Sequence, residues 1–134
     1  MPARGGDGDG DRATIDSRPA VYGQLGDGTN VDRSTPTPVS GVTDVVELTT
    51  GFLHTCARQG GGAVVCWGNN MYGQLGDGTD RSHNTPTPVY GSIDAVEISA
   101  GDTRTCARDR RGGGLCWGDT VSWWGSRPTP VVGL

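Results

Sequence analysis

The sequence predicts an all-β chain in which a four-stranded antiparallel sheet occurs about twice, and three observations support this prediction. The segment YGQLGDGT occurs at residues 22–29 and again at 72–79. Aligning residues 22–68 with 72–118 without a gap gives identical residues at 26 of 47 positions. Only 33% of the 134 residues are hydrophobic and 24 are glycine, which is typical of turn-rich β structure.

Each repeat begins with three short runs that have strand character. Alternation in the first run predicts that Val46 and Leu48 share one face while Glu47 lies on the other, and the same pattern recurs fifty residues later. The glycines of 60–62 predict a hairpin between the second and third runs. The expected strands are 45–49, 55–58 and 64–67 in one repeat, and 95–99, 105–108 and 115–117 in the next.

A fourth strand of each repeat is expected at 86–90 and again at 128–132. Its prolines cannot donate backbone hydrogen bonds on both sides, so it must form the outer edge of its sheet. Four antiparallel strands that end on a proline-protected edge describe one blade of a β-propeller.

The repeat divides the chain into four parts. Residues 1–21 are expected to form a flexible, acidic tail rich in Gly and Asp. Residues 22–41 would be the end of a preceding repeat, 42–90 the first blade, and 91–134 a second blade. Eight residues, including QLGDGT, are missing from the last connection of the second blade.

The four cysteines form two pairs with nine residues between the partners. If Gly61 is the centre of its hairpin, Cys56 and Cys66 lie directly opposite each other, and Cys106 and Cys116 do the same. One disulfide per blade follows, and bridged cysteines would indicate an oxidising compartment. Reduced core thiols remain the alternative, whereas the spacing is too wide for a zinc knuckle.

Three segments together resemble the regulator of chromosome condensation repeat in its bacterial, cysteine-containing form. They are HTCAR at 54–58, VVCWGNNMYGQLGDGT at 64–79 and PTPV at 86–89, and the resemblance covers residues 22–132. It implies a seven-bladed propeller, and similar repeats occur in secreted or surface proteins. The repeat motif falls on Tyr22, Gly23, Gln24, Leu25, Gly26, Trp67, Gly68, Tyr72, Gly73, Gln74, Leu75, Gly76, Trp117 and Gly118.

Two blades and one preceding outer edge make an incomplete propeller. Two blades bury one interface and leave two apolar faces in water, although repeat arrays need about three units for stability. The chain is therefore expected to be a fragment of a longer propeller, or else a homo-oligomer whose copies complete a ring.

Candidate binding residues lie where the repeats differ, because a repeated scaffold leaves its function to variable positions. His54 and its counterpart Arg104 stand at the end of a strand, and an ordinary solvated side chain is the simpler interpretation of His54. Trp123 and Trp124 lie on the shortened connection and are candidate anchors for a partner. The alternative is that Trp124 takes the place of Tyr72 and Trp123 packs beside it.

Other site classes are disfavoured by the sequence. The glycine-rich motif lacks the Lys and Ser/Thr of a phosphate loop, and Asp77 is expected to cap its turn. Leu75 and Tyr72 of this motif are expected to fill the gap between the blades. The acidic run near residue 9 lacks the Gly and Glu of a calcium loop. Glu47 and Glu97 could form an acid and base pair, but structural pairing with Arg58 and Arg108 fits their repetition better. No catalytic set, metal or cofactor is expected.

The net charge is −4, and arginine is the only basic residue besides two histidines. This charge disfavours nucleic acid as a binding partner. No apolar run could span a bilayer, and the first residues lack the centre of a secretory signal. The sequence predicts a non-catalytic protein-interaction module with an unknown protein partner, placed outside the cell if its cysteines are bridged. Guanine-nucleotide exchange on a small GTPase, which the resemblance implies, and a purely structural repeat are the alternatives.

Overall fold

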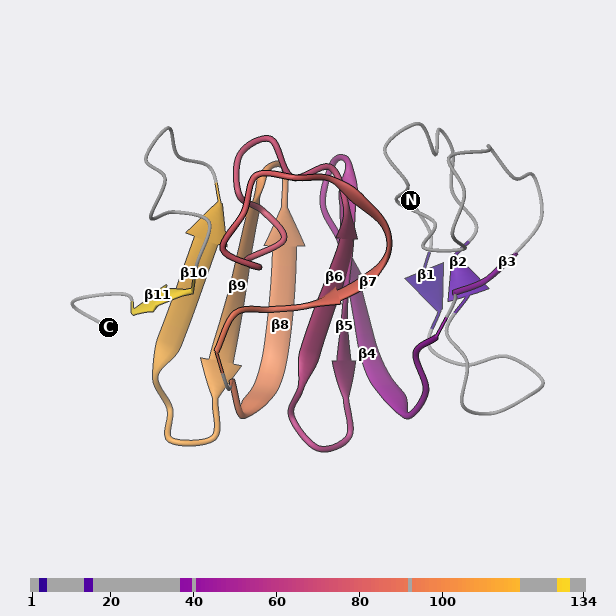
Figure 1. Cartoon of the computed structure of the whole chain (residues 1–134). Helices are drawn as coiled ribbons and strands as arrows, with labels where there is room; N and C mark the ends of the chain where they lie inside the picture. Colours follow the sequence, from indigo (N-terminus) through magenta and orange to yellow (C-terminus); the bar gives the residue numbers. More distant parts are fainter. Residues whose placement is uncertain are drawn as a thin grey trace.

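The computed structural model describes residues 3–4, 14–15, 37–39, 41–91, 93–118 and 128–130. Within these ranges all regular structure is antiparallel β-strand, and no helix occurs. Two four-stranded sheets lie side by side, and a smaller sheet lies beyond the first of them (Figure 1). No helix in the described part of the chain has the length and apolarity needed to cross a bilayer.

The two larger sheets have the same topology. In blade 1 the order is β4 (Val45–Thr50), β5 (His54–Gln59), β6 (Val64–Gly68) and β7 (His83–Pro88). In blade 2 the order is β8 (Ala95–Gly101), β9 (Arg104–Asp109), β10 (Gly114–Gly118) and β11 (Thr129–Pro130). The expected incomplete propeller of two such blades is confirmed.

The third sheet joins three strands of two residues each. They are β1 (Ala3–Arg4), β2 (Thr14–Ile15) and β3 (Thr37–Pro38), in that order. β3 precedes Thr87–Pro88 of β7 by fifty residues, the place expected for a preceding outer edge. β1 and β2 lie within residues 1–21, the segment that the sequence predicted to be a flexible, acidic tail. The rest of that expected tail lies outside the described residues.

The outer strand of blade 1 begins and ends earlier than the sequence predicted. β7 covers His83–Pro88 rather than 86–90, and it pairs Thr87 with Cys66 and Pro88 with Val65 of β6. Among the described strands, β6 is the one that pairs with β7, so the prolines lie on the outer edge as expected. In blade 2 the expected strand 128–132 is described only as far as β11, because residues 131–132 lie outside the described ranges.

The predicted alternation along β4 and β8 is wrong because each strand has a bulge. The register shifts between Val45 and Glu47, and the same shift occurs between Ala95 and Glu97. A bulge adds one residue to the strand, so the side chains before the bulge point to the opposite face from the one that simple alternation predicts. Val46 is therefore 52% exposed, whereas Ala95 and Ile98, three positions apart, are both buried.

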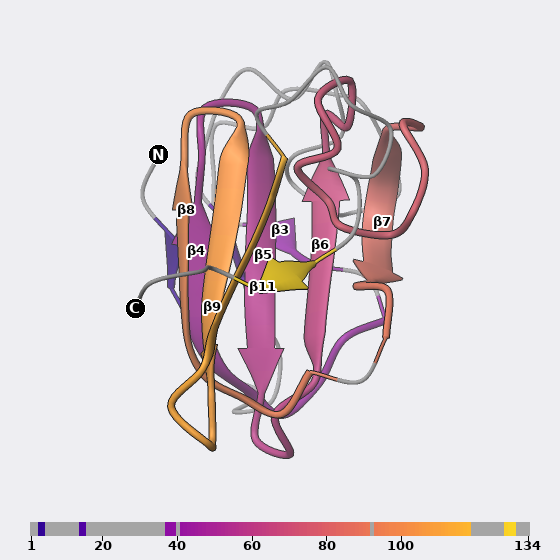
Figure 2. The same ribbon diagram turned by 90° about the vertical axis from the view of Figure 1, so that its left-hand side faces the viewer.

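The main hydrophobic core fills the contact between the two blades. Figure 2 shows β8 and β9 in front of β4 and β5, so one sheet lies against the face of the other. The buried side chains that meet there are Cys56, Val64, Cys66, Leu75, Val89, Ala95, Ile98, Ala107 and Trp117. A second core lies on the opposite face of blade 1 and consists of Val39, Val42, Ala57 and Trp67.

Candidate functional site

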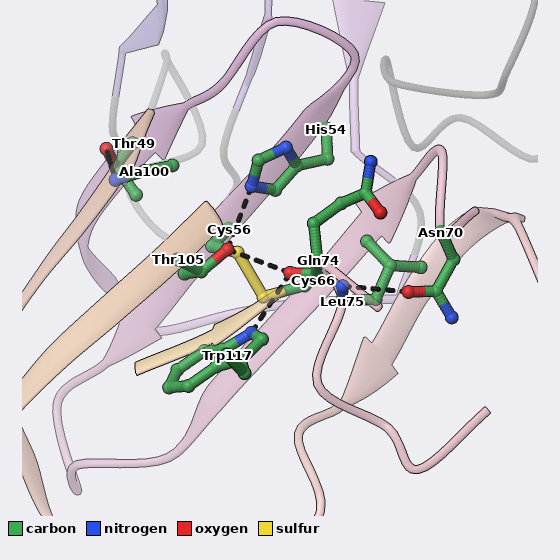
Figure 3. Close-up of a disulfide and its surroundings, with 10 residues drawn as sticks. All are labelled: Thr49, His54, Cys56, Cys66, Asn70, Gln74, Leu75, Ala100, Thr105 and Trp117. Atoms are coloured by element: carbon green, nitrogen blue, oxygen red, sulfur yellow. Dashed lines mark hydrogen bonds between the residues drawn. A yellow bond between two sulfur atoms is a disulfide. The ribbon is translucent and has the colours of Figure 1, made fainter. Parts of the chain in front are cut away.

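Buried polar groups cross the contact between the blades and meet at one backbone carbonyl. The Gln74 oxygen accepts hydrogen bonds from the Thr105 hydroxyl at 2.8 Å and from the Trp117 Nε1 at 3.0 Å (Figure 3). Thr105 and Trp117 belong to β9 and β10 of blade 2, whereas Gln74 lies on the connection from β6 to β7 of blade 1. We call this group, together with His54, the interblade seam. It joins the glycine-rich motif of one repeat to the sheet of the next.

His54 completes the seam from β5. Its Nε2 lies 2.8 Å from the Thr105 hydroxyl oxygen. Because Thr105 gives its only hydroxyl hydrogen to Gln74, His54 Nε2 must be the donor. The other ring nitrogen, Nδ1, makes no hydrogen bond to any described residue. Burial lowers the pKa of His54 to about 4, so the ring is neutral at pH 7.

The sequence interpretation of His54 as a partner contact, or as a solvated side chain, is wrong. The residue is 0% exposed, because the fold of blade 2 covers the end of β5. Its counterpart Arg104 is exposed on blade 2. The two copies of one repeat position therefore occupy different environments, one inside the seam and one at an open surface.

The repeat motif of 72–79 is a structural connection held by Asn70. The Asn70 side chain accepts from the Leu75 N–H at 2.9 Å and donates to Asp77 and to the Thr79 and Arg81 carbonyls. Asp77 also accepts from the Thr79 N–H at 2.9 Å, which confirms its predicted capping role.

Two residues of the motif were expected to fill the gap between the blades, and only one does so. Leu75 is fully buried in the main core. Tyr72 is 47% exposed, so that part of the expectation is wrong. Gly76 packs against Trp117, where an added Cβ would lie 2.6 Å from Nε1 at a φ of +70°. Trp67 and Trp117 are both buried, and Gly68, Gly73 and Gly118 have positive φ.

Both cysteine pairs lie opposite each other on neighbouring strands and are bonded. Cys56 pairs with Cys66 and Cys106 pairs with Cys116, each with a Cα–Cα distance of 4.1 Å. Cys56 and Cys66 are fully buried in the main core, whereas Cys106 and Cys116 are partly exposed. The described residues contain no cluster of His, Cys, Asp or Glu that could hold a metal ion.

The two repeated glutamates form ion pairs with arginines of the adjacent strand. Glu47 accepts from Arg58 Nε at 2.8 Å, and Glu97 accepts from Arg108 Nε at 3.2 Å. These are the structural pairs that the sequence suggested. Glu47 additionally accepts a backbone hydrogen bond from Ile98 of blade 2 at 3.2 Å, which accounts for part of its burial.

Exposed apolar side chains gather on the connections at one end of the blades. Phe52 and Met71 are 68% and 65% exposed. The Phe52 N–H donates to the Asp102 carbonyl at 3.0 Å, which joins the β4–β5 and β8–β9 connections. Tyr72, Asp102 and Arg104 lie around a hollow of about 700 Å³. We call these five residues the blade-end surface; its connections lie at the top of Figure 1.

Several predicted site residues lie outside the described part of the chain. They are Tyr22, Gly23, Gln24, Leu25 and Gly26 of the first motif, and Trp123 and Trp124 of the shortened connection. The sequence reasoning also missed residues that the structure brings together. Thr105 and Asn70 were not singled out, although the repetition of Thr55 at Thr105 was a signal for the first.

Comparison with protein families gives matches to one repeat. The family model described as the regulator of chromosome condensation (RCC1) repeat matches residues 21–58 and 61–108. A second model of the same repeat matches residues 45–74. Comparison with curated proteins gives no match.

Solved structures of similar fold cover almost the whole chain. Human WBSCR16 is 23% identical over 90% of this chain, with a TM-score of 0.78. The crystal structure of Kap60 bound to yeast RCC1 (Prp20) contains a match of 17% identity over 94%, with a TM-score of 0.75. The crystal structure of Prp20p from Saccharomyces cerevisiae, described with its binding to Gsp1p and histones, matches with 17% identity over 92% of this chain and a TM-score of 0.74. The chain spans 33%, 34% and 35% of these chains, respectively.

Proposed function

Because the chain belongs to the regulator of chromosome condensation repeat family, we propose that it is a non-catalytic module that binds a protein partner through its blade-end surface. The observation that carries this proposal is the exposure of Phe52 and Met71. Large apolar side chains at this level of exposure on a rigid scaffold are typical of binding anchors.

The surrounding groups suit a protein surface rather than a small substrate. Tyr72 adds a half-exposed aromatic ring, and Asp102 and Arg104 supply charges of both signs beside it. An apolar centre with a polar rim is the usual composition of a protein interface. The carboxylates of Glu47 and Glu97 are paired with arginines, which fits a structural role of these two residues better than acid–base chemistry.

The place of action that we propose is outside the cell. Disulfides persist in oxidising compartments, and both cysteine pairs of this chain are bonded. The solved structures of similar fold are less than 25% identical, so their likeness concerns the fold, and nucleotide exchange is not carried over to this chain.

Site-specific photo-crosslinking tests the proposed surface. A benzophenone amino acid replaces Phe52 in one variant and Tyr90 in a control variant. Tyr90 suits the control because it is 52% exposed and comes after Pro88, at the end of β7 that lies away from the blade-end surface. Both variants are incubated with proteins secreted by the source cells, and adducts are identified by mass spectrometry. We expect one protein to form an adduct with the variant that carries the crosslinker at position 52 and to form none with the variant that carries it at position 90.

The same protein must then depend on the surface for its binding. We expect Phe52→Ala to weaken its affinity at least about tenfold, as anchor residues do, and Tyr90→Ala to leave it unchanged. Equal crosslinking at both positions, or equal affinity of both alanine variants, would contradict the proposal.

A further inference from the structure

His54 closes the hairpin that carries Phe52. The Gly51 N–H donates to the His54 carbonyl at 2.8 Å, so Phe52 and Leu53 form a tight loop between β4 and β5. The Asn69 N–H also donates to the Leu53 carbonyl at 2.8 Å. These two bonds hold the backbone of the loop within blade 1, and the residue that follows the loop is His54.

The side chain of His54 attaches the same loop to blade 2. Its Nε2 donates to the Thr105 hydroxyl at 2.8 Å, and the Phe52 N–H donates to the Asp102 carbonyl at 3.0 Å. Asp102 and Thr105 are three residues apart, at the connection from β8 to β9. The loop is therefore bound to one segment of blade 2 at two points, once by the ring of His54 and once by the backbone of Phe52.

The seam accommodates the neutral ring of His54 and lacks a described partner for a charged one. The ring is 0% exposed, and Nδ1 faces Gly51, where an added Cβ would lie 2.5 Å from it. Protonation places a hydrogen on Nδ1, which has no acceptor among the described residues. A buried charge with an unsatisfied N–H is costly. Burial accordingly lowers the pKa of His54 to about 4, against a smaller opposing effect of the Arg104 backbone.

Charged side chains of the described residues around His54 do not compensate a charge on its ring. The group bonded to the ring, the Thr105 hydroxyl, is neutral. Asp77 and His83 are bonded to each other at 3.1 Å, and Asp102 and Arg104 are exposed. The titratable or charged residues on the two connections packed against His54 are Tyr72, Asp77, Asp80, Arg81, His83, Asp102 and Arg104.

We propose that His54 is a positioning residue for Phe52, and that acid, by protonating its ring, frees the loop and weakens partner binding at the blade-end surface. The first half concerns this chain alone, whereas the second rests on the proposed function. A charged ring must leave the seam to reach water. Because His54 directly follows the loop, the backbone of Phe52 moves with it and loses its bond to Asp102.

The expected size of the effect follows from the pKa of His54 in its two environments. With about 4 in the closed seam and 6.5 in water, lowering the pH from 7.5 to 4.5 raises the equilibrium constant for loop opening about 50- to 100-fold. A loop that is open about 5% of the time at pH 7.5 would then be open most of the time at pH 4.5. The apparent affinity for a partner would fall about fourfold.

Amide NMR of the intact, disulfide-bonded protein tests the positioning of Phe52 without any partner. Spectra are recorded from pH 7.5 to 4.5 for the unmodified protein and for His54→Gln, whose side-chain amide can donate to Thr105 but does not titrate. In the unmodified protein, we expect the Phe52 amide shift to move toward that of an unstructured chain as the ring titrates. In the variant it should stay in place. The control is the Gln59 amide, which donates to Ala63 at the opposite end of β5 and should not move in either protein.

A second variant separates positioning from titration. His54→Ala has no donor for Thr105, so it should release the Phe52 amide already at pH 7.5, whereas His54→Gln should hold it there. A Phe52 amide that keeps its shift at pH 7.5 in both variants would contradict the positioning role.

The regulation is tested with the protein that is crosslinked at position 52. Its affinity is measured at pH 7.5 and 4.5 for the unmodified chain and for His54→Gln. The unmodified chain should lose about fourfold more affinity than the variant between these pH values. Titration of the partner and of other groups in this chain, including His83, is common to both measurements and cancels in the comparison.

The outcomes distinguish the two halves of the proposal. A Phe52 amide that shifts alike in the unmodified protein and in His54→Gln would overturn the titration of the loop through His54. Equal losses of affinity in the two proteins would overturn the regulation. If no protein is crosslinked at position 52, the proposed function fails and the regulation fails with it, whereas the NMR comparison decides the positioning of Phe52 by itself.

Discussion

The imidazole of His54 in blade 1 donates a hydrogen bond of 2.8 Å to the Thr105 hydroxyl of blade 2. Thr105 has an identical counterpart at Thr55, whereas His54 is replaced by Arg104 in the next repeat. The contact therefore joins a repeated residue to one that varies between the copies. This contact distinguishes the interblade seam from the corresponding part of blade 2. Its contribution to stability can be measured by replacing one residue at a time.

Replacing Thr105 with Val should destabilise the protein by about 2 to 3 kcal/mol, because His54 Nε2 and the Gln74 carbonyl each lose a buried partner. The free energy of unfolding is measured in urea with the disulfides intact. Thr87→Val is the control, since the Thr87 hydroxyl is bonded only locally at the outer strand. It should change stability by no more than about 0.5 kcal/mol. Equal losses for the two variants would exclude a structural role of the Thr105 hydroxyl.

The free energy of unfolding should decrease as the pH is lowered, because His54 titrates. Its pKa is about 4 in the folded protein and about 6.5 when unfolded, so the unfolded chain binds the extra proton between these values. Stability is fully present above about pH 6.5 and is lost as pH falls toward 4, by about 2 to 3 kcal/mol at pH 4.5. Urea unfolding at pH 7.5 and 4.5 measures this loss in the unmodified protein and in the variant His54→Gln. Between the two pH values, the variant should lose about 2 to 3 kcal/mol less unfolding free energy than the unmodified protein. An unchanged pH dependence in the variant would contradict this assignment.

The repeat predicted the fold because a fixed offset of fifty residues determines strand order and blade neighbours together. It also placed Cys56 opposite Cys66 and Glu47 beside Arg58. The bulge at Val46 was not predictable, because alternation alone carries no signal for an inserted residue. The burial of His54 was missed for a related reason, since a difference between copies shows neither which blade covers a position nor which leaves it open.

Two glycines at equivalent positions should respond differently to alanine. A Cβ at Gly51 would lie 2.9 Å from the Asp102 carbonyl oxygen and against the His54 ring, whereas nothing lies within 4 Å at Gly101. Gly51→Ala should therefore cost about 1 to 3 kcal/mol of unfolding free energy through overpacking, and Gly101→Ala close to none. Thermal unfolding of both variants tests this difference. Similar midpoints would mean that blade 2 does not pack against the end of β4.

The two disulfides should differ in their resistance to a reductant. Cys56 and Cys66 are fully buried by blade 2, whereas Cys106 and Cys116 are partly exposed in blade 2. Reduction requires access to sulfur, so Cys106–Cys116 should react on the order of tenfold faster under native conditions. Timed alkylation with peptide mapping measures the two rates. Reaction of both pairs at one rate would show that blade 2 does not seal the first.

The packing of the two repeats as neighbouring blades is tested most directly by amide hydrogen exchange at Ile98 and Ala100. Their N–H groups lie on the inner edge of β8, and their acceptors are the side chains of Glu47 and Thr49 in blade 1. We predict that NMR will find both amides strongly protected, and that Glu47→Ala combined with Thr49→Ala will speed their exchange. Exchange of both amides at the rate of an unstructured chain in the unmodified protein would contradict the side-by-side arrangement.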